Sequence, residues 1–140
     1  MTFFRFLSTL CLLAGGLRAA DLTVVVKDVH SADGAVLIAI YDSDTHFMDP
    51  RHAKFTNRTK ASKGEVTFVF HNVPAGKYAI SCFHDENGNS RLDTNAMGIP
   101  TEGYGFSNDA HGVIGPASFV QAAFDFDGKG NKSIAFSLNY

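Results

Sequence analysis

Residues 65–83 read Glu-Val-Thr-Phe-Val-Phe-His-Asn-Val-Pro-Ala-Gly-Lys-Tyr-Ala-Ile-Ser-Cys-Phe. The first part of this stretch places Val66, Phe68 and Phe70 at alternate positions, a period of two that predicts a half-buried β-strand. Residues 72–76 predict a turn, because proline fixes φ and glycine permits unusual backbone angles. The apolar run that follows the turn predicts a second strand, so the stretch indicates an all-β domain.

Further strand-like runs lie on both sides of this stretch. They occupy residues 22–29, 35–41, 119–126, which is strand-like at its end, and 132–138. The run 35–41 is apolar on both faces, which is typical of a central strand, and the turn before it predicts a hairpin with 22–29. Six to seven strands without a convincing helix predict an antiparallel β-sandwich, immunoglobulin-like or transthyretin-like, with one long ordered loop at 94–118.

The strand after the turn leads directly into a loop rich in oxygen-bearing side chains. Asp and Asn recur there at alternate positions, and Ca²⁺ takes about 6–8 oxygen ligands, which alternate residues of one loop can supply. The spacing matches the first nine positions of the D-x-[DN]-x-[DN] calcium pattern, whose seventh position contributes a backbone carbonyl. The predicted metal ligands are Asp85, Asn87, Asn89, Arg91 through its carbonyl, Asp93 and, as a distant carboxylate, Glu102.

Two departures from this pattern leave an alternative open. Ser90 stands at the position of the turn glycine, and Ala96 stands where a bidentate glutamate is expected. Asp, Asn, Gly and Ser also cluster in ordinary polar turns, because they tolerate left-handed backbone angles and bond to their own backbone. The stretch is therefore either a calcium loop or a plain polar turn. Hard oxygen donors favour Ca²⁺ over Zn²⁺, and a flexible single segment favours Ca²⁺ over Mg²⁺.

Residues 98–119 combine glycines with apolar and aromatic side chains. A loop of this length in a small domain is usually functional or ordered by another part of the protein. Tyr104, Phe106 and Phe119 are candidate walls of a cleft for a small apolar ligand or a peptide. The alternative is that the same aromatic residues only anchor the loop to the sandwich.

The first twenty residues predict an export signal. A short positive start is followed by about eleven apolar residues and then by Ala19-Ala20, a candidate cleavage site. The apolar run is shorter than the ~20 residues that a membrane-spanning helix needs. We therefore expect a signal peptide at 1–20 and one domain at 21–140, exported to the periplasm or to the outside of the cell, with no membrane span.

Composition and motifs limit the classes of partner and of chemistry. A formal net charge of −2 gives no electrostatic reason to bind nucleic acid. The most basic segment, 51–63, predicts a solvated face or, as an alternative, a contact with an envelope protein or an acidic surface polymer. His84 and His111 provide acid–base groups, but neither G-x-S-x-G nor H-E-x-x-H occurs in the chain. We therefore expect a protein that is not an enzyme.

Two stretches closely resemble a family of exported bacterial proteins known as domain of unknown function 2141. They are 72–79, Asn-Val-Pro-Ala-Gly-Lys-Tyr-Ala, and 84–108, His-Asp-Glu-Asn-Gly-Asn-x-x-Leu-Asp-Thr-Asn-x-x-Gly-Ile-Pro-x-Glu-Gly-Tyr-Gly-Phe-Ser-Asn. This resemblance covers nearly the whole predicted mature chain and implies a single-domain envelope protein. A looser similarity, to the calcium-binding B repeats of staphylococcal surface adhesins, implies a transthyretin-like sandwich with calcium at the 85–102 loop.

These observations predict a calcium-stabilised binding or structural module. The alternative is a periplasmic carrier that holds a small apolar ligand or a peptide with its 98–119 loop.

Overall fold

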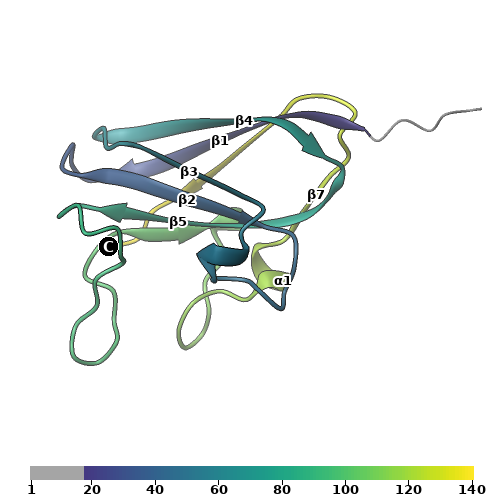
Figure 1. Ribbon diagram of the computed structural model, residues 1–140. Helices are drawn as coiled ribbons and strands as arrows, with labels where there is room; N and C mark the ends of the chain where they lie inside the picture. Colours follow the sequence, from purple (N-terminus) through teal and green to yellow (C-terminus); the bar gives the residue numbers. More distant parts are fainter. Residues whose placement is uncertain (1–17) are drawn as a thin grey trace, which may run out of the picture.

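The computed structural model describes residues 18–140 of the chain. These residues form eight strands in two sheets that pack face to face, which confirms the predicted all-β sandwich. Figure 1 shows the two layers, with β1 and β4 in the upper one and β2 and β5 in the lower one. Residues 1–17, which contain most of the predicted signal peptide, lie outside the described residues. Within 18–140, no helix has the length and apolar character to cross a membrane.

The first sheet contains three strands in the order β4-β1-β8. The central strand β1 (Ala19–Val29) pairs antiparallel with β4 (Gly64–Pro74) and parallel with β8 (Lys132–Ser137). The pairing with β8 makes the sandwich mixed at this edge, where a purely antiparallel one was expected. The predicted cleavage after Ala20 falls inside β1, because Ala20 already pairs with Val73 of β4.

The second sheet has the order β3-β2-β5-β6, and the short strand β7 also pairs with β5. Its strands are β2 (Ala35–Tyr41), β3 (Phe55–Lys60), β5 (Gly76–Asp85), β6 (Tyr104–Phe106) and β7 (Phe124–Phe126). All of these pairings are antiparallel. Since β2 lies between β3 and β5, the expectation that 35–41 is a central strand is confirmed.

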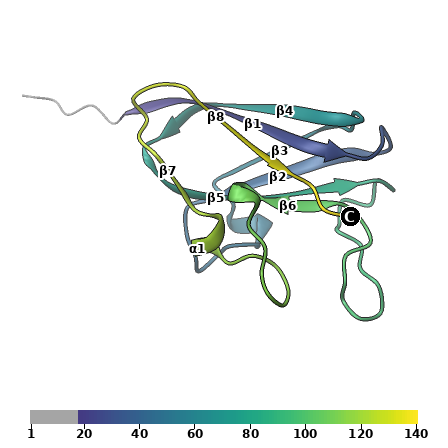
Figure 2. The ribbon, with the colours of Figure 1, turned by 180° about the vertical axis from the view of Figure 1, so that it is seen from behind.

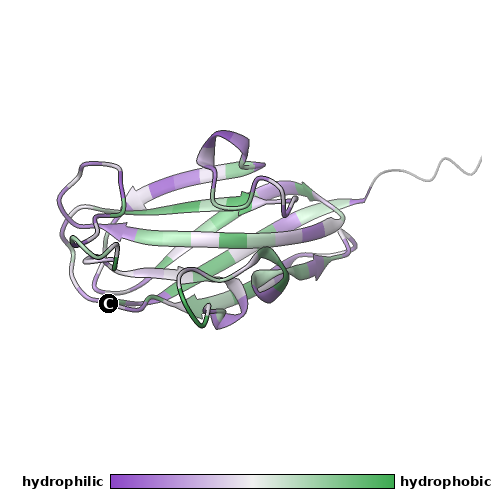
Figure 3. Cartoon of the chain, turned by 90° about the horizontal axis from the view of Figure 1, so that it is seen from below, coloured by the Kyte–Doolittle hydropathy of each residue, from purple (hydrophilic) through white to green (hydrophobic). Residues whose placement is uncertain are grey.

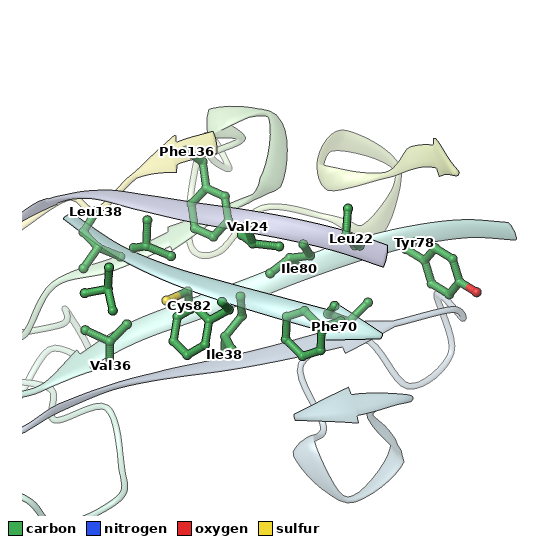
Figure 4. Close-up of a cluster of buried hydrophobic side chains, with 14 of the residues drawn as sticks. Leu22, Val24, Val36, Ile38, Phe70, Tyr78, Ile80, Cys82, Phe136 and Leu138 are labelled. Atoms are coloured by element: carbon green, nitrogen blue, oxygen red, sulfur yellow. The ribbon is translucent and has the colours of Figure 1, made fainter. Parts of the chain in front are cut away.

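The main core lies between the two sheets, where alternate side chains of facing strands meet. Figure 4 shows Leu22 and Val24 of β1 facing Ile38 of β2 and Ile80 and Cys82 of β5. Each of these side chains is at most 3% exposed. Burial raises the pKa of the Cys82 thiol, so this cysteine remains a neutral apolar group of the core.

Three local predictions from the sequence are wrong. β1 and β2 do not form a hairpin, because the turn between them crosses from one sheet to the other. The segment 42–64, for which the sequence predicted no strand, contains β3 and a 3-10 helix, η1 (Pro50–His52). The run 119–126 ends in a strand, β7, as expected, but it begins with a helix, α1 (Phe119–Ala122), where no helix was expected, because Ser118 and Gln121 form a reciprocal capping box at its start.

A second apolar cluster covers part of the outer face of the five-stranded sheet. Its buried members are Tyr41, Ala79, Phe106, Ala117, Phe119 and Ala122. The buried hydroxyl of Ser107 holds this layer in place, because it accepts from the Ile80 N–H at 2.9 Å and donates to the Ala122 carbonyl at 2.5 Å. Ser107 begins η2 (Ser107–Asp109), so the hydroxyl ties the long loop and α1 to β5.

Candidate functional site

The candidate metal loop begins at the end of the central strand β5. Asp85 is the last residue of β5, pairs with Ala35 of β2 and is completely buried. Gly34 packs directly against this point, since a Cβ atom on Gly34 would lie 1.9 Å from the Asp85 carbonyl oxygen. The sheet and the turn before β2 therefore fix the first predicted ligand, as a rigid binding site requires.

The Asp85 carboxylate closes a tight turn. Its Oδ1 accepts a hydrogen bond from the Asn89 N–H at 3.1 Å, and its Oδ2 accepts one from the Ser90 N–H at 2.8 Å. Ser90 has a φ of 62°, in the left-handed region that glycine enters most easily. The serine thus adopts a left-handed conformation at the position of the turn glycine in the calcium pattern, and its side chain does not prevent the turn.

Glu102 lies beside the same loop although it is distant in sequence. It is 5% exposed, and its two carboxylate oxygens accept from the Glu86 N–H and the Asp93 N–H, each at 3.0 Å. These bonds hold the first and last parts of the loop together around one buried side chain. Glu102 therefore lies close to Asp93, as a sixth ligand that is distant in sequence would have to do.

The exposed side of the loop is built from Asn87, Asn89 and Asp93. The Asp93 Oδ2 accepts from the Nδ2 of Asn87 at 2.5 Å, and its Oδ1 accepts from the Nδ2 of Asn89 at 2.7 Å. The Asn89 Oδ1 accepts from the Arg91 N–H at 3.0 Å. Backbone and side-chain hydrogen bonds therefore link all five predicted side-chain ligands into one network.

The three carboxylates among the predicted ligands have no cationic side chain of the described residues in ion-pair contact. Asp85, Asp93 and Glu102 carry three formal negative charges, and none of them forms an ion pair within residues 18–140. Across the described chain, no three His, Cys, Asp or Glu side chains converge as a metal-binding group. N–H groups satisfy the carboxylates instead, which is the arrangement expected of a plain polar turn.

An apolar groove of about 1050 Å³ lies beside the loop, on the outer face of the five-stranded sheet. Strand register builds its floor from two cross-strand rows of side chains. They are Arg58–Leu37–Phe83–Tyr104 and Thr56–Ala39–Ser81–Phe106. Figure 3 looks onto this face of the molecule, with the chain coloured by hydropathy.

Two loops project from this face of the sandwich (Figures 1 and 2). Residues of both loops line the groove. The first is a small hairpin at 94–100, in which the Asn95 Oδ1 accepts from the N–H groups of Met97 and Ile99. The second, at 110–117, carries Ile114. Met97 is 83% exposed and Ile114 is 96% exposed. Exposed apolar side chains gathered around a concave apolar surface are typical of a binding site.

The three aromatic residues predicted to line a cleft have different positions. Tyr104 and Phe106 form part of the groove floor, with ring centroids 6.2 Å apart. Phe119 packs in the second apolar cluster, where its ring centroid lies 5.8 Å from that of Phe47. Phe119 is therefore a packing anchor outside the groove lining. Leu37 and Phe83, which the sequence reasoning did not assign to a cleft, occupy the middle of the floor.

His84, one of the candidate acid–base groups, is completely buried. Its Nε2 lies 2.6 Å from the Asp33 carbonyl oxygen and therefore donates to it, because a carbonyl can only accept. In the neutral ring, its Nδ1 accepts from the Tyr140 hydroxyl at 2.7 Å. Burial raises the pKa of Tyr140, which keeps that hydroxyl protonated. His84 thus joins the end of β5 to the turn before β2 and to the C-terminal residue.

One protein family matches residues 24–135 of the chain, a range that contains both the loop and the groove. The family is described as an uncharacterized protein conserved in bacteria, DUF2141. This is the family that the two stretches at 72–79 and 84–108 resemble. No curated protein and no solved structure gives a significant match.

Proposed function

The chain belongs to this bacterial family, and we propose that it is an exported, non-enzymatic binding module whose 85–102 loop is stabilised by Ca²⁺. The periplasmic or extracellular location rests on the export signal predicted at 1–20. An envelope protein or an acidic surface polymer is the candidate macromolecular partner for the basic segment 51–63.

The observation that carries the calcium proposal is the pair of buried carboxylates at Asp85 and Glu102. A buried carboxylate is costly unless hydrogen bonds or a cation compensate its charge. Each of the two accepts two backbone N–H bonds and has no cationic side chain as partner within residues 18–140. A carboxylate offers about four lone-pair sites, so acceptor capacity remains for an ion.

The donor set fits a hard cation. Asp85, Asp93 and Glu102 would supply charged oxygens, and the Arg91 carbonyl would supply a neutral one. The amides of Asn87 and Asn89 now direct nitrogen toward Asp93, but each amide carries an oxygen on the same rotatable group. Six oxygen donors from one flexible segment suit Ca²⁺ better than the strict octahedron of Mg²⁺.

The expected gain in stability is modest. Extracellular calcium modules bind with Kd values of about 10⁻⁴–10⁻³ M. At a free Ca²⁺ concentration tenfold above Kd, binding would stabilise the folded state by about 1.4 kcal/mol. In a domain of this size that gain raises Tm by about 5 °C.

Thermal melts of the purified protein in EDTA, in millimolar CaCl₂ and in millimolar MgCl₂ test the calcium proposal. We expect Ca²⁺ alone to raise Tm, and we expect Asp93→Asn to remove most of that rise with little change in EDTA. Asp93 is the variant of choice because its partners are exposed side chains. Asp44→Asn, which removes the same charge from an exposed position away from the loop, should leave the rise intact. An undiminished calcium response in an Asp85→Asn, Asp93→Asn double variant would contradict the assignment.

The groove favours a second candidate function, a carrier of a small apolar ligand or a peptide. Its volume of about 1050 Å³ lies at the upper end of the range that ligand sites commonly have. Binding of the neutral dye Nile red, together with mass spectrometry of small molecules extracted from the native protein, tests this function. A protein that is purified empty and leaves the dye fluorescence unchanged would exclude it.

A further inference from the structure

The charged residues that line the apolar groove all have one sign. They are Arg58 and Arg91, and the lining contains no Asp or Glu, although the chain carries 14 acidic and 12 basic residues. Neither guanidinium forms an ion pair with a carboxylate of residues 18–140. A concave surface lined by one sign of charge attracts a ligand of the opposite sign.

Both arginines belong to the end of the groove that adjoins the 85–102 loop. Arg58 lies on the edge strand β3, at the end of the floor row that continues with Leu37. Its Nη1 donates to the Ser90 hydroxyl at 3.0 Å, and Arg91 is the next residue along the chain. A guanidinium has five N–H donors in a planar fork, so most donors of Arg58 remain for a carboxylate or a phosphate.

The apolar part of the groove extends away from these arginines across the sheet. From Arg58 the floor row runs through Leu37 and Phe83 to Tyr104, with each pair set by strand register. Leu92 and Met97, which belong to the 85–102 loop, line one wall of the groove. A ligand that fills the groove would therefore meet cationic donors at one end and mainly apolar side chains along the rest of its length.

We propose that the groove binds a single-chain amphiphile with an anionic headgroup, whose chain lies along the floor and whose headgroup is held by Arg58 and Arg91. This proposal rests on the carrier function given above and adds the chemistry of the ligand. A purely apolar ligand would leave both guanidinium groups without an anionic partner within residues 18–140. A fatty acid and a phosphate-headed lipid share the chemistry that the two arginines recognise, so both kinds of headgroup belong in the test.

Displacement of Nile red from the full-length protein tests the ligand class. The competitors are dodecanoate, dodecyl phosphate, dodecanol and dodecyltrimethylammonium, each below its micelle-forming concentration. We expect at least one anion to bind about tenfold or more tightly than dodecanol, because a hydrogen bond to a charged group is worth that much. The cation should bind more weakly than dodecanol. Each methylene added to the preferred anion should tighten Kd about fourfold until the groove is full.

Variants identify the headgroup site. Arg58→Gln and Arg91→Gln should each weaken binding of the preferred anion by about tenfold and leave dodecanol binding unchanged. Lys63→Gln is the matched control, because Lys63 carries the same charge in the turn after β3 and does not line the groove. It should change neither affinity. Thermal melts confirm that each variant remains folded.

The failures are distinguishable. If no amphiphile and no dye binds, the carrier function and this inference both fall. If the dye binds but anion, alcohol and cation displace it equally, the carrier function stands and the anionic headgroup is excluded. If an acidic peptide displaces the dye and dodecanoate does not, the groove is a peptide site and the amphiphile is excluded. Unchanged anion affinity in the Arg58→Gln, Arg91→Gln double variant would overturn the assignment of the headgroup to these residues.

Discussion

Gly34 is the residue on which the position of the metal loop depends most directly. It has a φ of +67°, and a Cβ atom there would lie 1.9 Å from the Asp85 carbonyl oxygen. We expect Gly34→Ala to destabilise the protein by about 2–4 kcal/mol, as the sum of a left-handed backbone and a steric clash. Gly88→Ala separates the two effects, because Gly88 has a φ of +74° and open space around its Cα. It should cost only about 1 kcal/mol. Urea denaturation measures both, and equal losses would mean that the contact with Asp85 is unimportant.

The sequence predicted which residues of the loop lie close together better than it predicted what each residue does. The alternate Asp and Asn residues do meet in one network, because alternate positions of a short loop can turn toward one centre. Phe119 was assigned to a cleft because it is aromatic and lies in a long loop, but it is the first residue of α1 and packs in the second apolar cluster. The Ser118 to Gln121 spacing is a capping-box signal, and it could have revealed the helix that redirects Phe119.

Among the elements, the 110–117 loop carries two neighbouring apolar side chains that are almost fully exposed. Val113 is 99% exposed and Ile114 is 96% exposed, but only Ile114 lines the groove. We expect Ile114→Ser to weaken Nile red binding by about threefold to tenfold, because apolar contact area with the ligand is lost. Val113→Ser should leave dye binding unchanged. Neither variant should alter the free energy of unfolding by more than about 0.5 kcal/mol. Equal effects of the two variants on dye binding would show that the loop does not shape the site.

The run 35–41 shows what sequence can predict about an element and what it cannot. Apolar residues on both faces correctly predicted a central strand, and the same pattern explains why a second apolar surface remains on the outer face. Which sheet a strand joins depends on its partners elsewhere in the chain, so the short turn after β1 wrongly predicted a hairpin. β3 escaped detection because it is an edge strand whose central residues are polar and exposed.

In the whole molecule, the loop and the C-terminus lie at the same end of the sandwich (Figure 1). Tyr140 connects them, because its hydroxyl accepts from the His30 N–H at 3.1 Å and donates to the buried His84. Its ring stacks on that of His30, with centroids 3.6 Å apart, and packs against Gly103. The last residue of the chain thus joins the end of β1, the end of β5 and the return of the long loop. The position of the loop is therefore set by both sheets together.

This arrangement predicts that loss of one hydroxyl at Tyr140 weakens the fold and the loop together. In Tyr140→Phe the His84 Nδ1 has no donor inside the protein, and an unsatisfied buried polar group costs about 1–3 kcal/mol. Tyr78→Phe is the control, because the Tyr78 hydroxyl donates only to the Pro74 carbonyl, far from the loop. Its loss should cost about 0.5–1.5 kcal/mol.

Hydrogen exchange at the Glu86 and Asp93 amides reports on the loop itself. Faster exchange in Tyr140→Phe than in Tyr78→Phe is expected, since His84 directly precedes Asp85. Equal exchange in both variants would mean that the loop holds its shape without the C-terminal residue.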